Sequence, residues 1–359
     1  MTNIQIKSQT NKNSRKNSDR PEERPAEQSA VAPAIVPITR PMLGWLPERE
    51  YLFSLVSRNH AYWGYRAAAD TVGVFFGTRK ERALGPACSD VEYLVARTEG
   101  CLGSPIEIFQ NHTLFRFYRL FMKPSEVKNL LAPSSTTAES QLKYPMALWN
   151  GLFTARHPLK ACIECMEADL ADLGMPYWRL SHQYPGVWIC LAHKRILQRT
   201  SVKTSSQLRF NLHCPDADAL EPPFVATDKT VLFSFARLIE NLTDTKQEGV
   251  AAIAEFRLRF LAHLEAQGLL NSSKRLKAFD RSDVQQLCAD FLHATNLLQE
   301  LPECRSFPVS AVHAYYSLAS YINGKSKIYP VLQLAIILWF RTLPFWCEAD
   351  EAKWILRSL

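Results

Sequence analysis

The chain has 359 residues, 47% of them hydrophobic, with 42 lysines and arginines against 35 acidic residues, a net charge of +7 and a pI near 8.9. This length and composition suit a globular protein of two or three compact domains and exclude a largely disordered or fibrous chain. The basic excess is moderate, so it permits contact with nucleic acid or another polyanion without requiring it.

Cysteine usage and hydropathy bear on the cellular compartment. The nine cysteines are an odd number, and the sequence shows no signal peptide that would direct it to oxidising space. The longest apolar run, residues 331–340, is too short to span a bilayer. We therefore expect a soluble cytoplasmic protein with no membrane partner.

Residues 1–40 have the composition of a disordered tail. They are rich in Asn, Ser, Lys, Arg, Glu, Gln and Pro and nearly without aromatics, so they cannot bury enough apolar surface to offset the ordering entropy. Their charges are mixed in sign, which argues against a dedicated basic arm for DNA.

Residues 41–135 carry the pattern of short helices joined by tight turns. Apolar residues recur at three- and four-residue steps, with proline, serine or acidic residues near the starts and glycine at the ends. The pattern predicts three helices, opening at residues 46–50 and then spanning 67–76 and 89–98, with a further helix over 125–131. Such a triplet is typical of a helix-turn-helix bundle.

The helix-turn-helix pattern does not by itself establish DNA binding, because most small helical triplets bind no DNA. If this bundle binds DNA, the natural phosphate contacts are the basic residues after the second helix, namely Arg79, Lys80 and Arg82. The alternative is an ordinary solvated loop.

Two pairs of metal-ligand residues dominate the middle of the chain. Two residues separate Cys162 from Cys165, and after 24 further residues Cys190 and His193 repeat that spacing. Such spacing lets a tight turn direct both side chains of a pair at one cation, and three thiolates with an imidazole complete a tetrahedral zinc shell. The sequence therefore predicts a structural Zn²⁺ site in a zinc-finger module over residues 141–215.

Buried free thiols and a redox Cys-x-x-Cys remain alternatives to zinc. The redox interpretation expects a βαβ unit, whereas residues 166–170 look helical without strands on both sides. A Cys3His shell is closed to substrate, so it implies a scaffold and not a catalytic site. We expect His182 to hydrogen-bond within the fold, and short strands on either side of residues 185–186.

Other candidates for chemistry are weak. A second metal site lacks paired ligand spacing, its candidates being His213, Cys214, Cys288 and Cys304. Asp216 and Asp218 stand close together, but the prolines around them predict a loop. We therefore expect a protein that is not an enzyme.

The last part of the chain, residues 220–359, is expected to form an α-helical domain. Apolar residues recur at helical spacing in four segments, 231–242, 249–267, 281–300 and 308–322. The predicted fold class is mainly α, with an N-terminal helix-turn-helix-like bundle, a central zinc-finger module with short strands and a C-terminal helical domain.

An ordered set of motifs accompanies the ligand pairs along residues 41–200. These are Leu46-Pro47-Glu48, Gly64, His112-Thr113-Leu114-Phe115, Ala161-Cys162-Ile163-Glu164-Cys165, Tyr177-Trp178-Arg179, His182-Gln183, Pro185-Gly186-Val187 and Cys190-Leu191-Ala192-His193. In this order they resemble the TniQ/TnsD family of transposition target-selection proteins. Residues 329–337 with Phe345-Trp346 show a weaker likeness to a helical segment of the longer TnsD proteins.

The resemblance implies a non-catalytic component of a bacterial cut-and-paste transposon, acting at the nucleoid. Such proteins recognise the target by binding DNA or by docking on an RNA-guided CRISPR complex, and they recruit an AAA+ ATPase that brings the transposase. A homodimer is compatible with this role. The predicted zinc ligands match those of the family.

The DNA-contacting residues of the family do not carry over to this chain one by one. Site-specific TnsD proteins continue into further C-terminal helices, and their absence here favours a short TniQ-type adaptor. The alternative function is a sequence-specific DNA-binding zinc-finger regulator unrelated to transposition.

Overall fold

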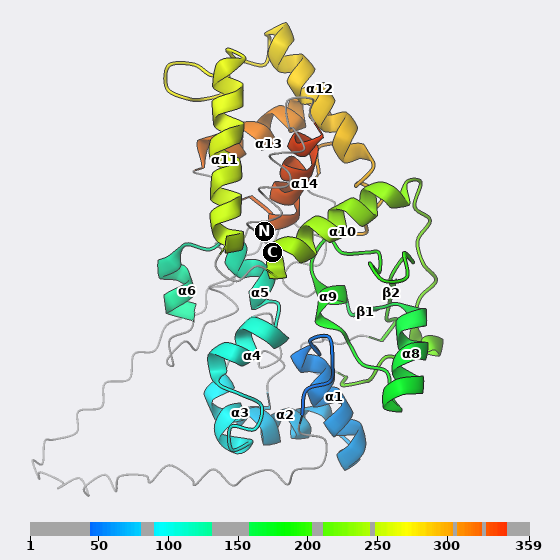
Figure 1. Ribbon diagram of the computed structural model, residues 1–359. Helices are drawn as coiled ribbons and strands as arrows, with labels where there is room; N and C mark the ends of the chain where they lie inside the picture. Colours follow the sequence, from blue (N-terminus) through cyan, green and yellow to red (C-terminus); the bar gives the residue numbers. More distant parts are fainter. Residues whose placement is uncertain are drawn as a thin grey trace, which may run out of the picture. The chain divides into compact units, whose positions relative to one another are not determined.

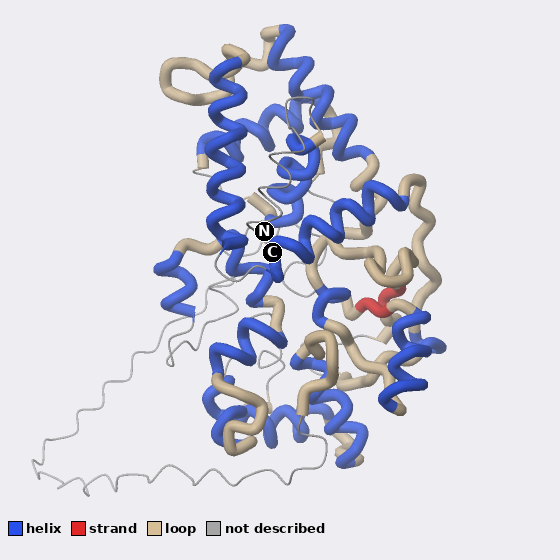
Figure 2. Tube along the Cα trace, in the orientation of Figure 1, coloured by secondary structure: helices blue, strands red, loops and turns tan. Residues whose placement is uncertain are grey.

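A computed structural model describes residues 44–79, 90–130, 158–202, 211–244, 248–303, 307–324 and 328–342. Helices dominate these residues and the strands are few and short, which confirms the mainly α fold class (Figure 1; Figure 2). The predicted tail at residues 1–40 lies outside the described residues.

The N-terminal part consists of short helices, as the sequence pattern predicts. The first three pack on one another in succession, and Gly64 and Gly77 end the first two in the left-handed conformation that a helix C-terminus favours. The helices are α1 (Leu52–Trp63), α2 (Ala68–Phe76), α3 (Val91–Arg97), α4 (Pro105–His112), α5 (Phe115–Tyr118), η2 (Arg119–Phe121) and α6 (Pro124–Leu130).

The segment before α1 is not the helical turn that its proline and acidic residues predict. Glu48 and Arg49 have φ of 53° and 59°, in the left-handed region. Glu50 is fully buried, and its carboxylate accepts a hydrogen bond from Arg58 Nε at 2.9 Å. Its backbone also forms a bridge with Arg179. Residues 47–49 therefore form a turn, and the two contacts hold Glu50 in a bridge where the sequence predicts the start of a helix.

The central part contains β1 (Lys160–Ala161), α8 (Ile163–Leu173), α9 (Leu180–Gln183) and β2 (Gln198–Arg199). The two strands pair antiparallel, with Lys160 opposite Arg199. The expectation of strands on either side of residues 185–186 was wrong, because α9 precedes this turn. Tyr184, Val187 and Trp188 are all buried. The apolar residues of this segment therefore belong to a buried loop and not to strands.

The C-terminal part is helical, as predicted. It begins with η4 (Ala217–Ala219), which Asp216 caps by accepting from the Asp218 amide at 3.1 Å, so the Asp216 carboxylate has a structural role. The long helices are α10 (Lys229–Asp244), α11 (Glu248–Ala266), α12 (Ser282–Asn296), α13 (Ala311–Asn323) and α14 (Pro330–Arg341).

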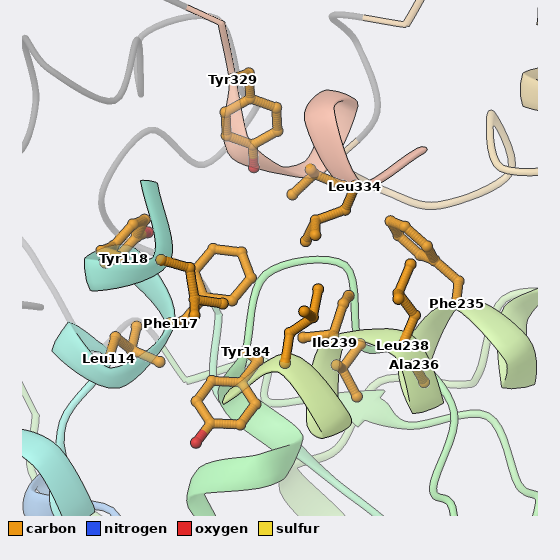
Figure 3. Packing of buried hydrophobic residues seen from close by; sticks show 14 of the residues in the cluster. Leu114, Phe117, Tyr118, Tyr184, Phe235, Ala236, Leu238, Ile239, Tyr329 and Leu334 are labelled. Atoms are coloured by element: carbon orange, nitrogen blue, oxygen red, sulfur yellow. The ribbon is translucent and has the colours of Figure 1, made fainter. Parts of the chain in front are cut away.

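Helices far apart in the sequence share one apolar core. Figure 3 shows side chains of α5, α10 and α14 gathered with Tyr184 from the loop after α9. The rings of Phe117 and Tyr184 stack with centroids 6.2 Å apart. The central module is therefore packed directly against both the N-terminal and the C-terminal helices.

The loop at residues 184–187 is held from two sides by buried charged groups. Lys160 Nζ donates to two carbonyl oxygens of the loop, at 3.0 and 2.6 Å, and burial lowers its pKa to about 8. Glu303, just after α12, accepts from the Gly186 amide. Both side chains are fully buried. The C-terminal helices are thus tied to the central module by polar as well as apolar contacts.

Replacing Gly186 should test how tightly this loop is packed. It has φ of 86°, and a Cβ would lie 2.8 Å from Ile239 Cδ1 and 2.9 Å from Phe235 Cε1. We expect Gly186→Ala to lower the free energy of unfolding by about 3 kcal/mol, from backbone strain plus overpacking. The measurement is urea denaturation. Gly174→Ala is the control, because its φ is 75° with open space around the Cβ; equal losses in the two variants would contradict the tight packing.

His112 joins the segment before α1 to α4. Its Nδ1 donates to the Glu50 carbonyl at 2.7 Å, and its ring stacks on Trp45 with centroids 3.4 Å apart. Burial lowers the pKa of His112 to about 4. The unfolded chain therefore takes up a proton on this side chain before the folded protein does.

The His112 shift predicts a loss of stability as the pH falls from about 6.5 to 4. At pH 5 the contribution is about 2 kcal/mol relative to pH 7.5. We expect His112→Asn, which keeps a donor for the Glu50 carbonyl, to reduce the pH dependence by that amount in urea denaturation at the two pH values. His293→Asn, at an exposed position on α12, should leave it unchanged. An unaltered pH dependence in His112→Asn would contradict the assignment.

Candidate metal centre

The start of α8 and a nearby turn bring the four predicted ligands together. Cys162 is the N-cap of α8, and Cys165 follows one helical turn later. Cys190 and His193 lie in a tight turn in which the Cys190 amide donates to the Arg195 carbonyl at 2.8 Å. Each pair is therefore positioned by local backbone geometry, as the two-residue spacing predicts.

The distances between the ligand atoms match a tetrahedral site. All four atoms lie within 4.8 Å of one another. Cys165 Sγ is 3.6 Å from Cys190 Sγ and 3.3 Å from His193 Nδ1, and that nitrogen is 3.6 and 3.7 Å from the sulfurs of Cys162 and Cys190. Zinc bonds of about 2.3 Å to sulfur and 2.0 Å to nitrogen place tetrahedral ligands about 3.5–3.8 Å apart. The group can hold a metal ion and is compatible with zinc.

Neighbouring hydrogen-bond donors favour a thiolate at Cys190, although burial acts in the opposite direction. The three cysteines are buried, whereas His193 is exposed. Hydrogen bonds from the Cys162 and Cys165 thiols, and a weaker one from His182, lower the pKa of Cys190. A thiolate is the form of cysteine that binds metals.

Two side chains outside the group support its geometry. His182 is buried and hydrogen-bonds to Cys190, and it does not belong to the four-residue group. Glu164 accepts from the Cys162 thiol at 3.1 Å and forms an ion pair with Arg195 at 2.7 Å. Such outer contacts orient metal ligands. The Glu164 pair also links α8 directly to the turn that carries the second ligand pair.

The other cysteine and histidine candidates do not form a second group among the described residues. His213 Nε2 lies 3.1 Å from Thr200 Oγ1, and its carbonyl accepts from Trp178 Nε1 at 2.8 Å. Burial raises the pKa of Cys214 to about 11, which keeps its thiol protonated. Cys304 lies outside the described residues.

Residues 49–54 pair with residues 178–180, a contact that the sequence did not reveal. The Tyr51 amide donates to the Trp178 carbonyl at 2.9 Å, and the Leu180 amide donates to the Arg49 carbonyl at the same distance. Ser54 Oγ accepts from the Trp178 amide at 3.0 Å. The metal group and the helical bundle are therefore joined by backbone hydrogen bonds.

Arg179 completes this junction with its side chain. The guanidinium forms ion pairs with Asp169 of α8, at 2.5 Å, and with Glu48. It also lies over the Tyr177 ring, 5.3 Å from the centroid. One side chain thus connects α8 to the segment before α1.

The structure gives only partial information on the predicted DNA contacts. Arg79 is 70% exposed and pairs with Asp70 of α2. Lys80 and Arg82 lie outside the described residues.

A comparison with known protein families identifies the region that contains the junction and the metal group. Residues 45–197 match the TniQ family. This region is a TniQ domain. The match spans the junction and the metal group together, and it confirms the resemblance over most of residues 41–200. A search of curated proteins found no significant match to the chain.

The TniQ domain gives a general indication of function. It implies a role in target selection during transposition, and TniQ is a non-catalytic, adaptor-type domain. Among the described residues, no helix is both long and apolar enough to cross a membrane. The TniQ match ends before residues 329–337, so the weaker likeness of that segment to TnsD proteins stays a prediction.

Proposed function

We propose that this protein is a non-catalytic adaptor that selects the insertion target of a bacterial cut-and-paste transposon. It recognises target DNA, or a guide complex already bound to DNA, and recruits an AAA+ ATPase that brings the transposase. The TniQ match over residues 45–197 carries this proposal. The joining of the helical bundle to the metal group supports it, because an adaptor must hold its contact surfaces in a fixed relation.

We further propose that Cys162, Cys165, Cys190 and His193 hold a structural Zn²⁺. When bound, the ion would cross-link the start of α8 to the turn at residues 190–195. Three thiols and one imidazole at tetrahedral spacing support this assignment. The ion would then stabilise the surface of the domain without taking part in a reaction.

The DNA contacts and the division of the chain also remain proposals. Arg79, Lys80 and Arg82 are proposed to contact phosphate, which the exposure of Arg79 permits. The proposed parts are a tail at 1–40, a helix-turn-helix-like part at 41–135, a zinc module at 141–215 and a helical domain at 220–359.

Metal analysis tests the zinc assignment. We expect about one zinc per chain in the native protein, and we expect Cys162→Ser to lose the metal together with on the order of 3 kcal/mol of stability, because metal binding is coupled to folding. The measurements are elemental analysis and urea denaturation. Cys101→Ser, at an exposed thiol outside the group, should keep both. Native protein without zinc, or unchanged stability of Cys162→Ser, would contradict the assignment.

Reconstituted transposition tests the targeting role. We expect at least a tenfold loss of insertions at the preferred target when this protein is omitted from a reaction containing the ATPase and transposase of the same element. The measurement is sequencing of insertion junctions. An identical distribution of insertions with and without the protein would contradict the proposal. DNA binding without any recruitment of the ATPase would instead support the DNA-binding regulator.

A further inference from the structure

A cavity of about 90 Å³ lies beside the metal group. Its lining comes from the segment before α1, from Cys165 of α8, from residues 179–192 and from α10. Val187, Ile189 and Ala236 in this lining are buried, whereas Glu48 and Ala192 are exposed. The buried lining also includes His182 and the metal-group cysteines Cys165 and Cys190. The cavity therefore has an inner wall of apolar, sulfur and imidazole groups and a polar opening, and it has room for more than a single water molecule.

Negative charge predominates in the lining. Glu48 and Glu240 contribute carboxylates, and the one guanidinium, from Arg179, is already engaged by Glu48 and Asp169. Within the described parts of the chain, no cation forms an ion pair with Glu240. A further cation in the cavity would face a carboxylate that has no ion-pair partner there.

The surroundings of Glu240 leave its carboxylate poorly stabilised, so an added cation would stabilise it. Burial, then the neighbouring Asp244 and, more weakly, Cys190 raise its pKa, while Arg49 and Arg237 act in the opposite direction. The existing cations do not offset the loss of hydration. Placing a positive charge against this carboxylate would compensate for that loss.

The combination of this inner wall and the acidic lining selects the chemistry of the occupant. A side chain with an aliphatic stem and a cationic head can place the stem against Leu191 and Ala236 and the head between the two carboxylates. Arginine fits better than lysine, because a guanidinium is more weakly hydrated and its planar donors match carboxylates. Its size also suits a cavity of several water volumes.

We propose that this cavity binds the guanidinium group of an arginine side chain presented by a partner protein. That the partner belongs to the transposition machinery rests on the proposed function, whereas binding of the guanidinium does not. Glu240 and Glu48 are the residues that recognise the charge, and Ala192 and Ala236 lie in the same lining.

A titration of the full-length, zinc-loaded chain with N-acetyl-argininamide tests the proposal. The alanine methyl groups of Ala192 and Ala236 report binding by NMR. We expect saturable shifts of both with a Kd on the order of 1 mM, as suits so small a ligand. The methyl of Ala61, exposed on α1, should not move. N-acetyl-citrullinamide, which has the same shape without the charge, should bind at least tenfold more weakly.

Substitutions then assign the recognition to the named carboxylates. Glu240→Gln should weaken binding of the arginine probe at least fivefold, and Glu48→Gln, at the exposed opening, should also weaken it. Glu167→Gln, on the exposed face of α8, is the matched control and should bind as the native protein does. Absence of saturable shifts, equal binding of the citrulline probe, or native affinity in both Glu240→Gln and Glu48→Gln would overturn the proposal. Because no transposition component is present, these outcomes leave the targeting role untouched.

Discussion

The buried ion pair between Glu50 and Arg58 fixes the segment on which the rest of the TniQ domain depends. The Glu50 carboxylate accepts from Arg58, its carbonyl accepts from His112, and its backbone bridges to Arg179. Removing one partner of such a buried pair typically costs about 3–5 kcal/mol, because the other charge is left without compensation. Helices α1 and α4 and the metal-bearing module therefore share one anchoring residue.

The helices could be predicted from the sequence because their signals are local. Terminal glycines located the ends of α1 and α2, and apolar periodicity located α10, α11, α12 and α13 closely. The segment of α14 was not among the helices predicted from periodicity. The metal group was equally predictable, since each ligand pair is positioned by one turn. The pairing of residues 49–54 with 178–180 could not be predicted, because backbone hydrogen bonds over such a sequence distance leave no periodic trace. The proline and acidic residues of 46–50 predict a helix start, whereas this tertiary contact places them in a turn that leads into the bridge at Glu50.

The polar contacts around residues 184–187 show why the cavity also escaped sequence analysis. Lys160 and Glu303 look like ordinary surface residues in the sequence, yet both are fully buried against this loop. Glu240 likewise sits on α10, whose pattern reveals only an apolar face toward the core. The chemical setting of each residue is created by elements far away in the chain. Charge in the sequence therefore says little about where charge is buried.

The pairing of residues 49–54 with 178–180 has a consequence for biosynthesis. Tyr177 and Pro47, joined by a hydrogen bond of 2.6 Å, are 130 residues apart in the chain. During translation the N-terminal helices must wait for the distant partner to leave the ribosome before the junction can close, and contacts of such long range slow folding. Until then the segment before α1 has exposed backbone donors and acceptors. The nascent chain is thus open to aggregation or chaperone binding at this segment until residues 177–180 have left the ribosome.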